Sequence, residues 1–493
     1  MSYFLSLSME FPIFTQKKSM SYFVGREKEI RLLEQVLAEE RAGFVAVYGR
    51  RRVGKTMLIE QVFDKYLTFH LTGIANVTTE QQLVNFQAAF ERQAPLGMHR
   101  DTPKNWFSAF QQLITFLESR PPGKQVIFLD ELPWLDTPKS DFISSLEHFW
   151  NSWASTQPNL ILVVCGSAAS WMLNKLIHNR GGLHNRVTTR LRLEPFTLRE
   201  AEQLLLRKNT ALNRYQIIQY FMAVGGVPFY LDTFNGELSP MQNIEINCFS
   251  KDGFLRTEFD HLFQSLFTKA ERHVAVVEAI ASKTKGLTRS EIIQLTGLSN
   301  NGATTQLLSE LEESGFIRKY SPFGKTKRQS LFQLIDFFSL FHLKFIKNAH
   351  FTEEGNWLAA LESPVYRAWS GYAFEQVCLA HVPQIKKALG ISGIHSRSSS
   401  WRSKDVTDGA QIDLLIDRKD HVINLCEIKF SVEPFTISKA YAVNLRNKIG
   451  TFKTETDTRK AVWLTMITTF GLKKNKYSGS LVQHDLNMDC LFE

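Results

Sequence analysis

Cysteine is scarce in this sequence, and so are long apolar runs. The five cysteines are odd in number, far apart and free of any Cys-x-x-Cys pair, which argues against a disulfide framework or a zinc site and favours a reducing cytoplasm. No apolar stretch approaches the roughly 18 residues of a membrane span, and Glu10 interrupts the N-terminal segment that a signal peptide would occupy. We therefore expect a cytoplasmic protein without a membrane partner.

Length and composition predict a multidomain globular protein. With 493 residues we expect about three or four domains, and a hydrophobic fraction of 44% is sufficient for several buried cores. The formal net charge of +9 and the isoelectric point near 9.1 fit an anionic partner, although excess lysine and arginine also occur on ordinary solvated surfaces. Residues 20–23 repeat residues 1–4, and we assign residues 1–19 no function.

The most specific motif is Gly-Arg-Arg-Arg-Val-Gly-Lys-Thr, between an apolar run at 44–48 and a helix-like stretch at 57–62. Its spacing fits G-x-x-x-x-G-K-[ST], in which backbone N–H groups surround a polyphosphate at a helix N-terminus. We expect Lys55 to reach the outer phosphates and Thr56 to ligate Mg²⁺, a hard cation that keeps most of its waters. The predicted nucleotide-binding residues are Gly49, Arg50, Arg51, Arg52, Val53, Gly54, Lys55 and Thr56.

Two further apolar runs, 126–129 and 160–166, are typical of buried parallel strands. The first run ends at Asp130 and Glu131, and the second ends at Ser167. We expect Asp130 to hold the Mg²⁺ shell and Glu131 to orient and deprotonate the attacking water, because phosphoryl transfer depends on positioning and charge. A structural strand end is the alternative for each.

Together these motifs resemble the AAA+ and STAND ATPases of archaeal and origin-recognition type. Phe-Val-Gly-Arg-Glu at 23–27 looks like the turn that packs against adenine in that group, and Val-Gly-Gly-Val-Pro at 224–228 looks like its Gly-x-Pro signature. The resemblance implies that Pro228 contacts the base and that Ser167 senses the γ-phosphate. Ordinary turns would also explain both glycine-containing segments.

The same resemblance implies an arginine finger and a helical lid. Arg186 stands at the finger position, but Asn185 replaces the glycine that is usual there, so Arg190 is the alternative. Thr-Leu-Arg-Glu at 197–200 forms a capping-box pattern, in which the hydroxyl and the carboxylate satisfy backbone N–H groups of the first helical turn. We expect the lid to begin there.

Residues 270–335 have the pattern of a winged helix, with three helices followed by two strands. Between Gly315 and Ile335 there are five basic residues and no acid, including Lys325, Lys327 and Arg328 in the turn, which favours a phosphate-backbone partner. Packing against the lid is the alternative. The residues expected on the outer face of the third helix, where base edges would be read, are Asn301, Thr304, Thr305 and Gln306.

The C-terminal part combines carboxylates with a lysine. Glu427 and Lys429 are two apart on one predicted strand, so they share a face, and a hairpin would bring Asp413 close to both. These residues, with Glu375 on a preceding helix, resemble the PD-(D/E)xK restriction-endonuclease-like superfamily. The resemblance implies Mg²⁺ ligands at Asp413, Glu427 and Glu375, and catalytic roles for Glu427 and Lys429. The alternative is a salt-bridged strand without activity.

The sequence therefore predicts an α/β protein built around a P-loop AAA+-type parallel sheet. The expected domains are an ATPase core at 20–196, a helical lid at 197–265, a winged helix-turn-helix at 266–340 and a restriction-endonuclease-like α/β domain at 341–493. We expect ATP and Mg²⁺ as cofactors, DNA as a partner, and a homo-oligomer or protein partner.

Two functions are consistent with this organisation. The first is a DNA-associated ATPase whose nucleotide state controls the winged helix and a metal-dependent nuclease domain. The rival is a STAND-type signalling switch, in which nucleotide gates assembly and the C-terminal domain is an inactive scaffold.

Overall fold

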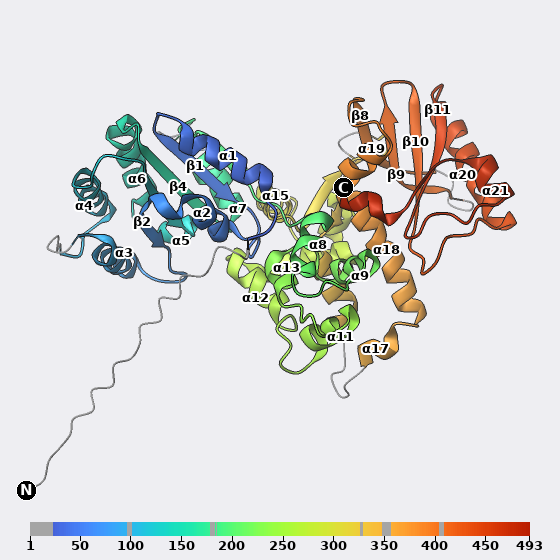
Figure 1. The fold of residues 1–493 in the computed structure, drawn as a ribbon, viewed down its shortest axis with the longest axis horizontal. Coiled ribbons are helices and arrows are strands. Elements are labelled where there is room, and N and C mark those ends of the chain that lie inside the picture. Colours follow the sequence, from blue (N-terminus) through green and yellow to red (C-terminus); the bar gives the residue numbers. More distant parts are fainter. Residues whose placement is uncertain are drawn as a thin grey trace, which may run out of the picture.

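Two α/β units flank a helical middle region in this computed structural model (Figure 1). The structure describes residues 23–95, 101–177, 183, 185–325, 329–347, 356–403 and 409–493. Within these ranges, no helix is both long enough and apolar enough to cross a membrane.

The N-terminal unit is built on a five-stranded sheet in the order β2-β3-β4-β1-β5, with every neighbouring pair parallel. The strands are β1 (Gly43–Tyr48), β2 (Leu67–Thr72), β3 (Gln125–Asp130), β4 (Leu160–Gly166) and β5 (Thr189–Arg192). Tyr48 of β1 is aligned with Gly166 of β4, and Leu129 of β3 with Val164 of β4. The loops that follow β1, β3 and β4 therefore emerge side by side, and the expectation of a parallel α/β sheet is confirmed.

Helices cover both faces of this sheet because its strands are apolar on both sides. They are α1 (Glu27–Ala38), α2 (Lys55–Phe63), α3 (Thr79–Gln93), α4 (Trp106–Glu118), α5 (Leu132–Leu135), α6 (Phe142–Ser152) and α7 (Ala169–Trp171). Val45 and Val47 point into a core shared with α1 and α2. Phe44 and Ala46 point to the other face, into a core shared with α3, α4 and α6.

The middle region is helical and includes a small hairpin. Its helices are α8 (Leu198–Leu206), α9 (Arg214–Val224), α10 (Pro228–Asp232), α11 (Pro240–Ile244), α12 (Glu258–Leu266), α13 (Ala270–Ala281), α14 (Arg289–Thr296), α15 (Gly302–Glu313), α16 (Phe337–Phe341) and α17 (Asn356–Ala360), and its antiparallel hairpin is β6 (Ile317–Tyr320) with β7 (Leu331–Leu334). The capping box expected at Thr197 and Glu200 is confirmed at the start of α8.

The structure describes the third helix throughout and the hairpin turn in part. Thr304 was expected to face outward, and this is wrong: it is buried, and its hydroxyl donates to the carbonyl of Ser299 at 2.6 Å. Its three polar neighbours in that prediction are exposed, although α15 also packs against α7 of the N-terminal unit (Figure 1). Lys327 and Arg328 lie outside the described residues.

The C-terminal unit contains a mixed five-stranded sheet in the order β12-β11-β10-β9-β8. Its elements are α18 (Pro364–Ala380), α19 (Val382–Ala388), β8 (Ser396–Arg402), β9 (Gln411–Arg418), β10 (Val422–Lys429), α20 (Lys439–Thr456), β11 (Ala461–Thr468), α21 (Lys476–Leu481) and β12 (Val482–Leu486). β8, β9 and β10 are antiparallel neighbours, whereas β10, β11 and β12 are parallel. A core with α20 covers one face of the sheet.

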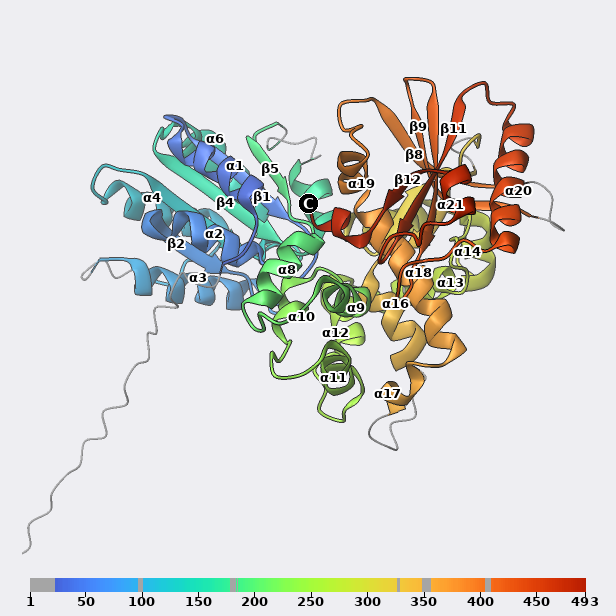
Figure 2. The ribbon, with the colours of Figure 1, turned by 45° about the vertical axis from the view of Figure 1, so that its right-hand side comes forward.

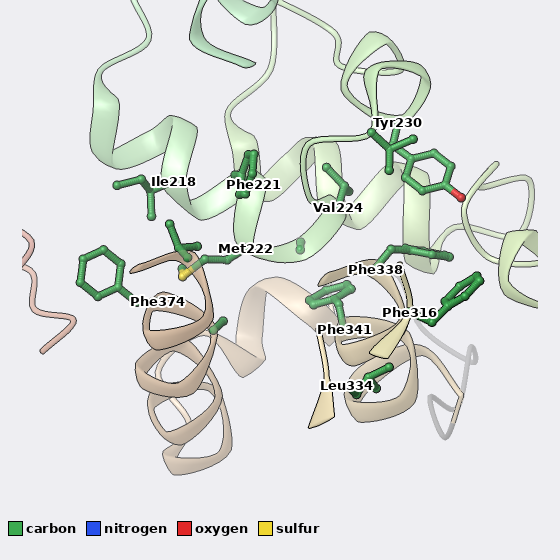
Figure 3. Close-up of a cluster of buried hydrophobic side chains, with 14 of the residues drawn as sticks. Ile218, Phe221, Met222, Val224, Tyr230, Phe316, Leu334, Phe338, Phe341 and Phe374 are labelled. Carbon is green, nitrogen blue, oxygen red and sulfur yellow. The ribbon is translucent and has the colours of Figure 1, made fainter. Parts of the chain in front are cut away.

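One apolar core joins the middle region to the other face of the C-terminal sheet. Figure 3 shows its centre, where Phe221 and Met222 of α9 meet Phe338 and Phe341 of α16 and Phe374 of α18. The same core extends from Phe196 to Phe492. The C-terminal turn, Met488–Phe492, packs against α8, α9 and α19 (Figure 2).

A buried histidine also connects α8 to the C-terminal unit. His381, which follows α18, is 2% exposed. Its Nε2 accepts from the N–H of Leu198 at 2.9 Å, while its Nδ1 lies 2.8 Å from the carbonyl oxygen of Val377. Burial lowers the pKa of His381 from 6.5 to about 4, so this imidazole is neutral in the fold at pH 6.

We predict that His381 contributes to the acid sensitivity of the fold. Its lowered pKa means that the unfolded chain binds a proton first, so stability should fall as pH drops from about 6.5 towards 4, by up to about 3 kcal/mol. His381→Gln keeps an acceptor for Leu198 and should reduce this fall in urea titrations at several pH values. The same change at exposed His395 is the control; equal acid sensitivity in wild type and His381→Gln would contradict the prediction.

Candidate nucleotide-binding site

The loop Gly49–Thr56 connects β1 to α2 at the carboxyl edge of the N-terminal sheet. Gly49 has a φ of 151°, and a Cβ at this position would lie 2.3 Å from the carbonyl oxygen of Leu193. Gly54 has a φ of 89°, in the region that favours glycine. Backbone conformation therefore requires both glycines of the motif. At Gly49, the close approach of Leu193, the residue after β5, also leaves no room for a side chain.

Lys55 is buried beneath the loop with its ammonium pointing back to it. Its Nζ donates to the carbonyl oxygens of Gly49 and Arg50, at 3.1 Å each. Burial lowers the pKa of Lys55, although the carboxylates of Glu131 and Asp130 oppose that shift. A buried cation whose hydrogen bonds go to neutral carbonyls is suited to receive an anion.

Thr56 and Asp130 face each other across the ends of α2 and β3. The Thr56 hydroxyl donates to Oδ2 of Asp130 at 2.7 Å, and Oδ1 of Asp130 accepts from the N–H of Glu131 at 2.9 Å. Both are oxygen donors, which is the ligand type that Mg²⁺ requires. The hydroxyl–carboxylate pair fits a cation bound between the protein and a polyphosphate.

Glu131 and Ser167 are in direct contact, which the sequence did not predict. Glu131 has a left-handed backbone, with φ 47°, and its side chain is turned towards β4. Its two carboxylate oxygens accept from the Ser167 hydroxyl at 2.9 and 2.7 Å, and Oε2 also accepts from the Ser167 N–H at 3.2 Å. Ser167 thus fixes the carboxylate at the edge of the site.

Two arginines of the loop form ion pairs with acids of the middle region. Arg50 is 5% exposed and forms an ion pair with Asp336, which lies between β7 and α16. Nη1 of Arg52 lies 2.7 Å from Oε2 of Glu258, the first residue of α12. For half-buried Arg51, the described part of the chain shows no hydrogen bond or ion pair. Sequence reasoning missed both acids, since neither belongs to a motif.

The turn at 23–27 lies at the junction of loop and lid. Arg26 is buried, its N–H donates to Oε1 of Glu200 at 3.0 Å, and its Nη2 donates to the Val53 carbonyl at 3.0 Å. Burial lowers the pKa of Arg26, opposed by Glu200. A Cβ at Gly25 would lie 2.7 Å from the Glu200 side chain. The turn therefore connects the phosphate loop to the capping box of α8.

The other residues expected to contact nucleotide, Pro228 and the two finger candidates, lie outside the phosphate loop. Pro228 is half-buried at the start of α10, and its neighbours Phe229 and Tyr230 both lie against the guanidinium of Arg52. Arg186 and the alternative finger Arg190 are exposed on this chain, and neither is joined to the loop by a hydrogen bond or ion pair of the described residues.

The C-terminal carboxylates are partly brought together. β9 and β10 pair antiparallel, as expected, with Cys426 opposite Leu414, so Asp413 and Glu427 are the next pair along the register. Asp413 accepts from the Gln411 amide. Burial, with Asp413 nearby, raises the pKa of Glu375 to about 8.

Glu427 is already neutralised by other side chains. Its carboxylate accepts from the Tyr441 hydroxyl at 2.6 Å and from Lys448 at 2.9 Å, and it lies 3.1 Å from Lys429. Burial favours a raised pKa for Glu427, but Lys429 and Lys448 outweigh it and hold the pKa below its ordinary value. Across the described ranges, no three His, Cys, Asp or Glu side chains are grouped closely enough to hold a metal.

Comparisons with known proteins agree with the N-terminal site. Residues 23–234 match the family described as an ATPase domain predominantly from Archaea. The uncharacterised protein MJECL04 of Methanocaldococcus jannaschii is 23% identical over 83% of this chain and 87% of its own length. The ATP-binding protein MJ0423 of the same organism is 48% identical over 8% of this chain and 71% of its own length.

The comparison with solved structures also supports the fold. The Walker-type ATPase PABY2304 of Pyrococcus abyssi is 17% identical, with a TM-score of 0.51, and the likeness covers 66% of this chain and 96% of that protein. The expectation of an archaeal-type ATPase domain is confirmed.

We predict that Lys55→Ala weakens ATP binding roughly tenfold to a hundredfold, because a charged hydrogen-bond partner contributes about 1.5–3 kcal/mol. Isothermal titration calorimetry with ATP and Mg²⁺ measures the dissociation constant. Lys65→Ala is the control, since Lys65 is exposed beyond the end of α2. Unchanged affinity in Lys55→Ala would contradict the assignment of the loop.

Proposed function

We propose that this chain, whose residues 23–234 form an archaeal-type ATPase domain, hydrolyses ATP with Mg²⁺ and uses nucleotide state to control the helical and C-terminal regions that follow. The observation that carries the proposal is the convergence of Lys55, the Thr56–Asp130 pair and Glu131 at one sheet edge. The direct ion pairs from the loop to Asp336 and Glu258 support the second half.

Each side chain has a task in hydrolysis. Lys55 would bind the outer phosphates, while Thr56 and Asp130 would hold Mg²⁺ and its waters. When bound, Mg²⁺ neutralises phosphate charge as it develops. Glu131 accepts the proton of the attacking water, and Ser167, through its contact with that carboxylate, relays the presence of the γ-phosphate.

The remaining roles concern the base and the finger. Pro228 contacts the base from the start of α10. Because Arg186 is exposed, its role as an arginine finger requires a second copy of the chain, with Arg190 as the alternative.

Glu131→Gln should leave ATP binding intact while hydrolysis falls by roughly a hundredfold to ten-thousandfold, since an amide cannot take the proton of the attacking water. Phosphate release under steady-state conditions measures turnover, and calorimetry measures binding. Glu80→Gln, an exposed change in α3, is the matched control. If Glu131→Gln hydrolyses ATP at the wild-type rate, Glu131 is not the base.

A second candidate activity is metal-dependent cleavage of DNA by the C-terminal unit. The order α18-α19-β8-β9-β10-α20-β11, with three antiparallel strands and then a parallel one, favours a restriction-endonuclease-like domain. Asp413, Glu427 and Glu375 would hold Mg²⁺ there, and Lys429 would stabilise the developing negative charge. Residues 266–340, proposed as a winged helix, would bind the DNA backbone.

The ion pairing of Glu427 favours the rival function instead. The Glu427 carboxylate is held by two lysines and a tyrosine, and it must give up these partners to bind a metal. An inactive scaffold in a STAND-type switch binds no metal there, so it can keep these contacts. DNA-stimulated ATP hydrolysis would support the first function, whereas nucleotide-dependent assembly without DNA affinity would support the switch.

Asp413→Ala separates the two candidates for the C-terminal unit. If the unit is a nuclease, Asp413→Ala should lose both Mn²⁺ binding in calorimetry and DNA nicking, whereas Lys429→Ala should keep the metal and lose nicking. ATP hydrolysis should be unchanged in both variants. Wild-type protein that neither nicks DNA nor binds Mn²⁺ through Asp413 would leave the unit as a scaffold.

A further inference from the structure

The three arginines inside the phosphate loop have different surroundings. Arg50 and Arg52 are paired with acids of the middle region, whereas Arg51 has no such partner within the described ranges. The Arg50–Asp336 pair joins residues 286 positions apart in the chain. The loop that is expected to surround phosphate is thus also an attachment point for the regions that follow.

Both acids are held in place by further hydrogen bonds. Asp336 caps the N-terminus of α16, where its Oδ2 accepts from the N–H and the hydroxyl of Ser339 at 2.9 and 2.5 Å. Glu258 is 2% exposed and accepts from the Tyr230 hydroxyl at 2.7 Å. These carboxylates cannot follow the arginines if the loop changes its contacts.

The buried apolar clusters of the chain stop on either side of this junction. The two cores of the N-terminal sheet end at Val187 and Leu193, and the core of the middle and C-terminal regions begins at Phe196. Within the described part of the chain, no apolar cluster includes residues from both sides. The junction is held by the two ion pairs, by the guanidinium groups of Arg50 and Arg52 lying over aromatic rings, and by packing of α7 against α15. The contacts made by the arginines respond to a charged ligand, as apolar burial does not.

The guanidinium of Arg50, which lies over the rings of Tyr230 and Phe316, also has unused hydrogen-bonding capacity. Its Nε and Nη2 are buried and have no hydrogen-bond partner among the residues described. A phosphate oxygen is a strong acceptor for such donors. Bound polyphosphate would also bring negative charge close to Asp336 and Glu258, where burial reduces solvent screening.

We propose that the phosphates of bound ATP compete with Asp336 and Glu258 for the guanidinium groups of Arg50 and Arg52. ATP binding therefore weakens the attachment of α12 and α16 to the phosphate loop. This inference rests on the proposed ATPase function and specifies how the nucleotide regulates the rest of the chain. Linkage makes the effect reciprocal, so weakening the attachment strengthens ATP binding.

The test measures ATP affinity after one acid is neutralised. Asp336→Asn retains a good helix cap, and Glu258→Gln retains an acceptor for Tyr230, so each removes mainly the negative charge. In full-length protein carrying Glu131→Gln to prevent hydrolysis, calorimetry should show ATP binding about tenfold tighter for each variant, equivalent to about 1.4 kcal/mol.

Asp489→Asn is the matched control. Asp489 forms a 3.0 Å ion pair with Arg214 of α9, which connects the C-terminal turn to the lid without contacting the loop. The Asp489→Asn variant should bind ATP with the same affinity as the parent protein. If the control also binds ATP more tightly, general loosening explains the effect and the competition is refuted.

The outcomes separate this inference from the proposed function. Tighter binding in Asp336→Asn and Glu258→Gln supports both. Normal binding in the parent with equal or weaker binding in both variants refutes the competition but leaves the ATPase assignment intact. Absence of ATP binding in the parent and in wild type refutes the assignment, and the competition with it. If Asp336→Asn fails to fold by circular dichroism, Glu258→Gln alone decides.

Discussion

A buried pair of opposite charges, Arg50 and Asp336, joins the phosphate loop to the start of α16. Removing one partner of a buried ion pair costs roughly 3–5 kcal/mol, because the other charge is left without compensation. The pair therefore fixes the phosphate loop against α16 as long as neither charge finds another partner. The polyphosphate that the loop is expected to bind offers such a partner for Arg50.

The regions beyond this junction are attached to one another by apolar contacts. The core from Phe196 to Phe492 joins the lid to the inner face of the C-terminal sheet. The face of the C-terminal sheet that α20 covers is also in contact with the middle region. The ring of Phe323, from the β6–β7 turn, packs against Phe452 of α20, and the backbone N–H of Phe323 donates to the carbonyl of Ser400 at 2.7 Å. These parts are expected to move together, because separating them would expose large apolar surfaces.

The contrast between the two kinds of attachment gives the chain a direction of control. If phosphate displaces the two acids as proposed, the ion pairs at the phosphate loop change, and the apolar core would carry the displacement to the C-terminal unit. Ser167 adds a second connection, since the strand end that it occupies precedes α7, and α7 contacts α15. The Ser167 end of the candidate site is thus close in the chain to α7, which contacts α15 of the middle region.

Features that are local in sequence could be predicted, and features that depend on packing could not. Apolar runs and required glycines located the sheet and the phosphate loop, and the Thr197–Glu200 spacing located the start of α8. The partner of Arg50 could not be predicted, because nothing local distinguishes Asp336 from other helix-capping acids. The burial of Thr304 could have been predicted, because Thr304 lies three and four positions before Leu307 and Leu308 and so shares their buried helix face.

The C-terminal carboxylates illustrate the same limit. Strand alternation correctly placed Glu427 and Lys429 on one face of β10. The expected hairpin also forms, and it pairs β10 with β9, the strand that carries Asp413. Lys448 and Tyr441 come from α20, and their contact with Glu427 depends on how that helix packs across the sheet. A motif identifies which groups share a strand face, but it does not identify which charges already compensate them.

Hydrogen–deuterium exchange with and without a non-hydrolysable ATP analogue tests the central claim most directly. If phosphate displaces the acids, amides at the starts of α12 and α16 should exchange faster in the presence of the analogue, while the loop at 49–56 becomes protected. Protection of the loop together with unchanged or slower exchange at Glu258–Leu266 and Phe337–Phe341 would contradict the account.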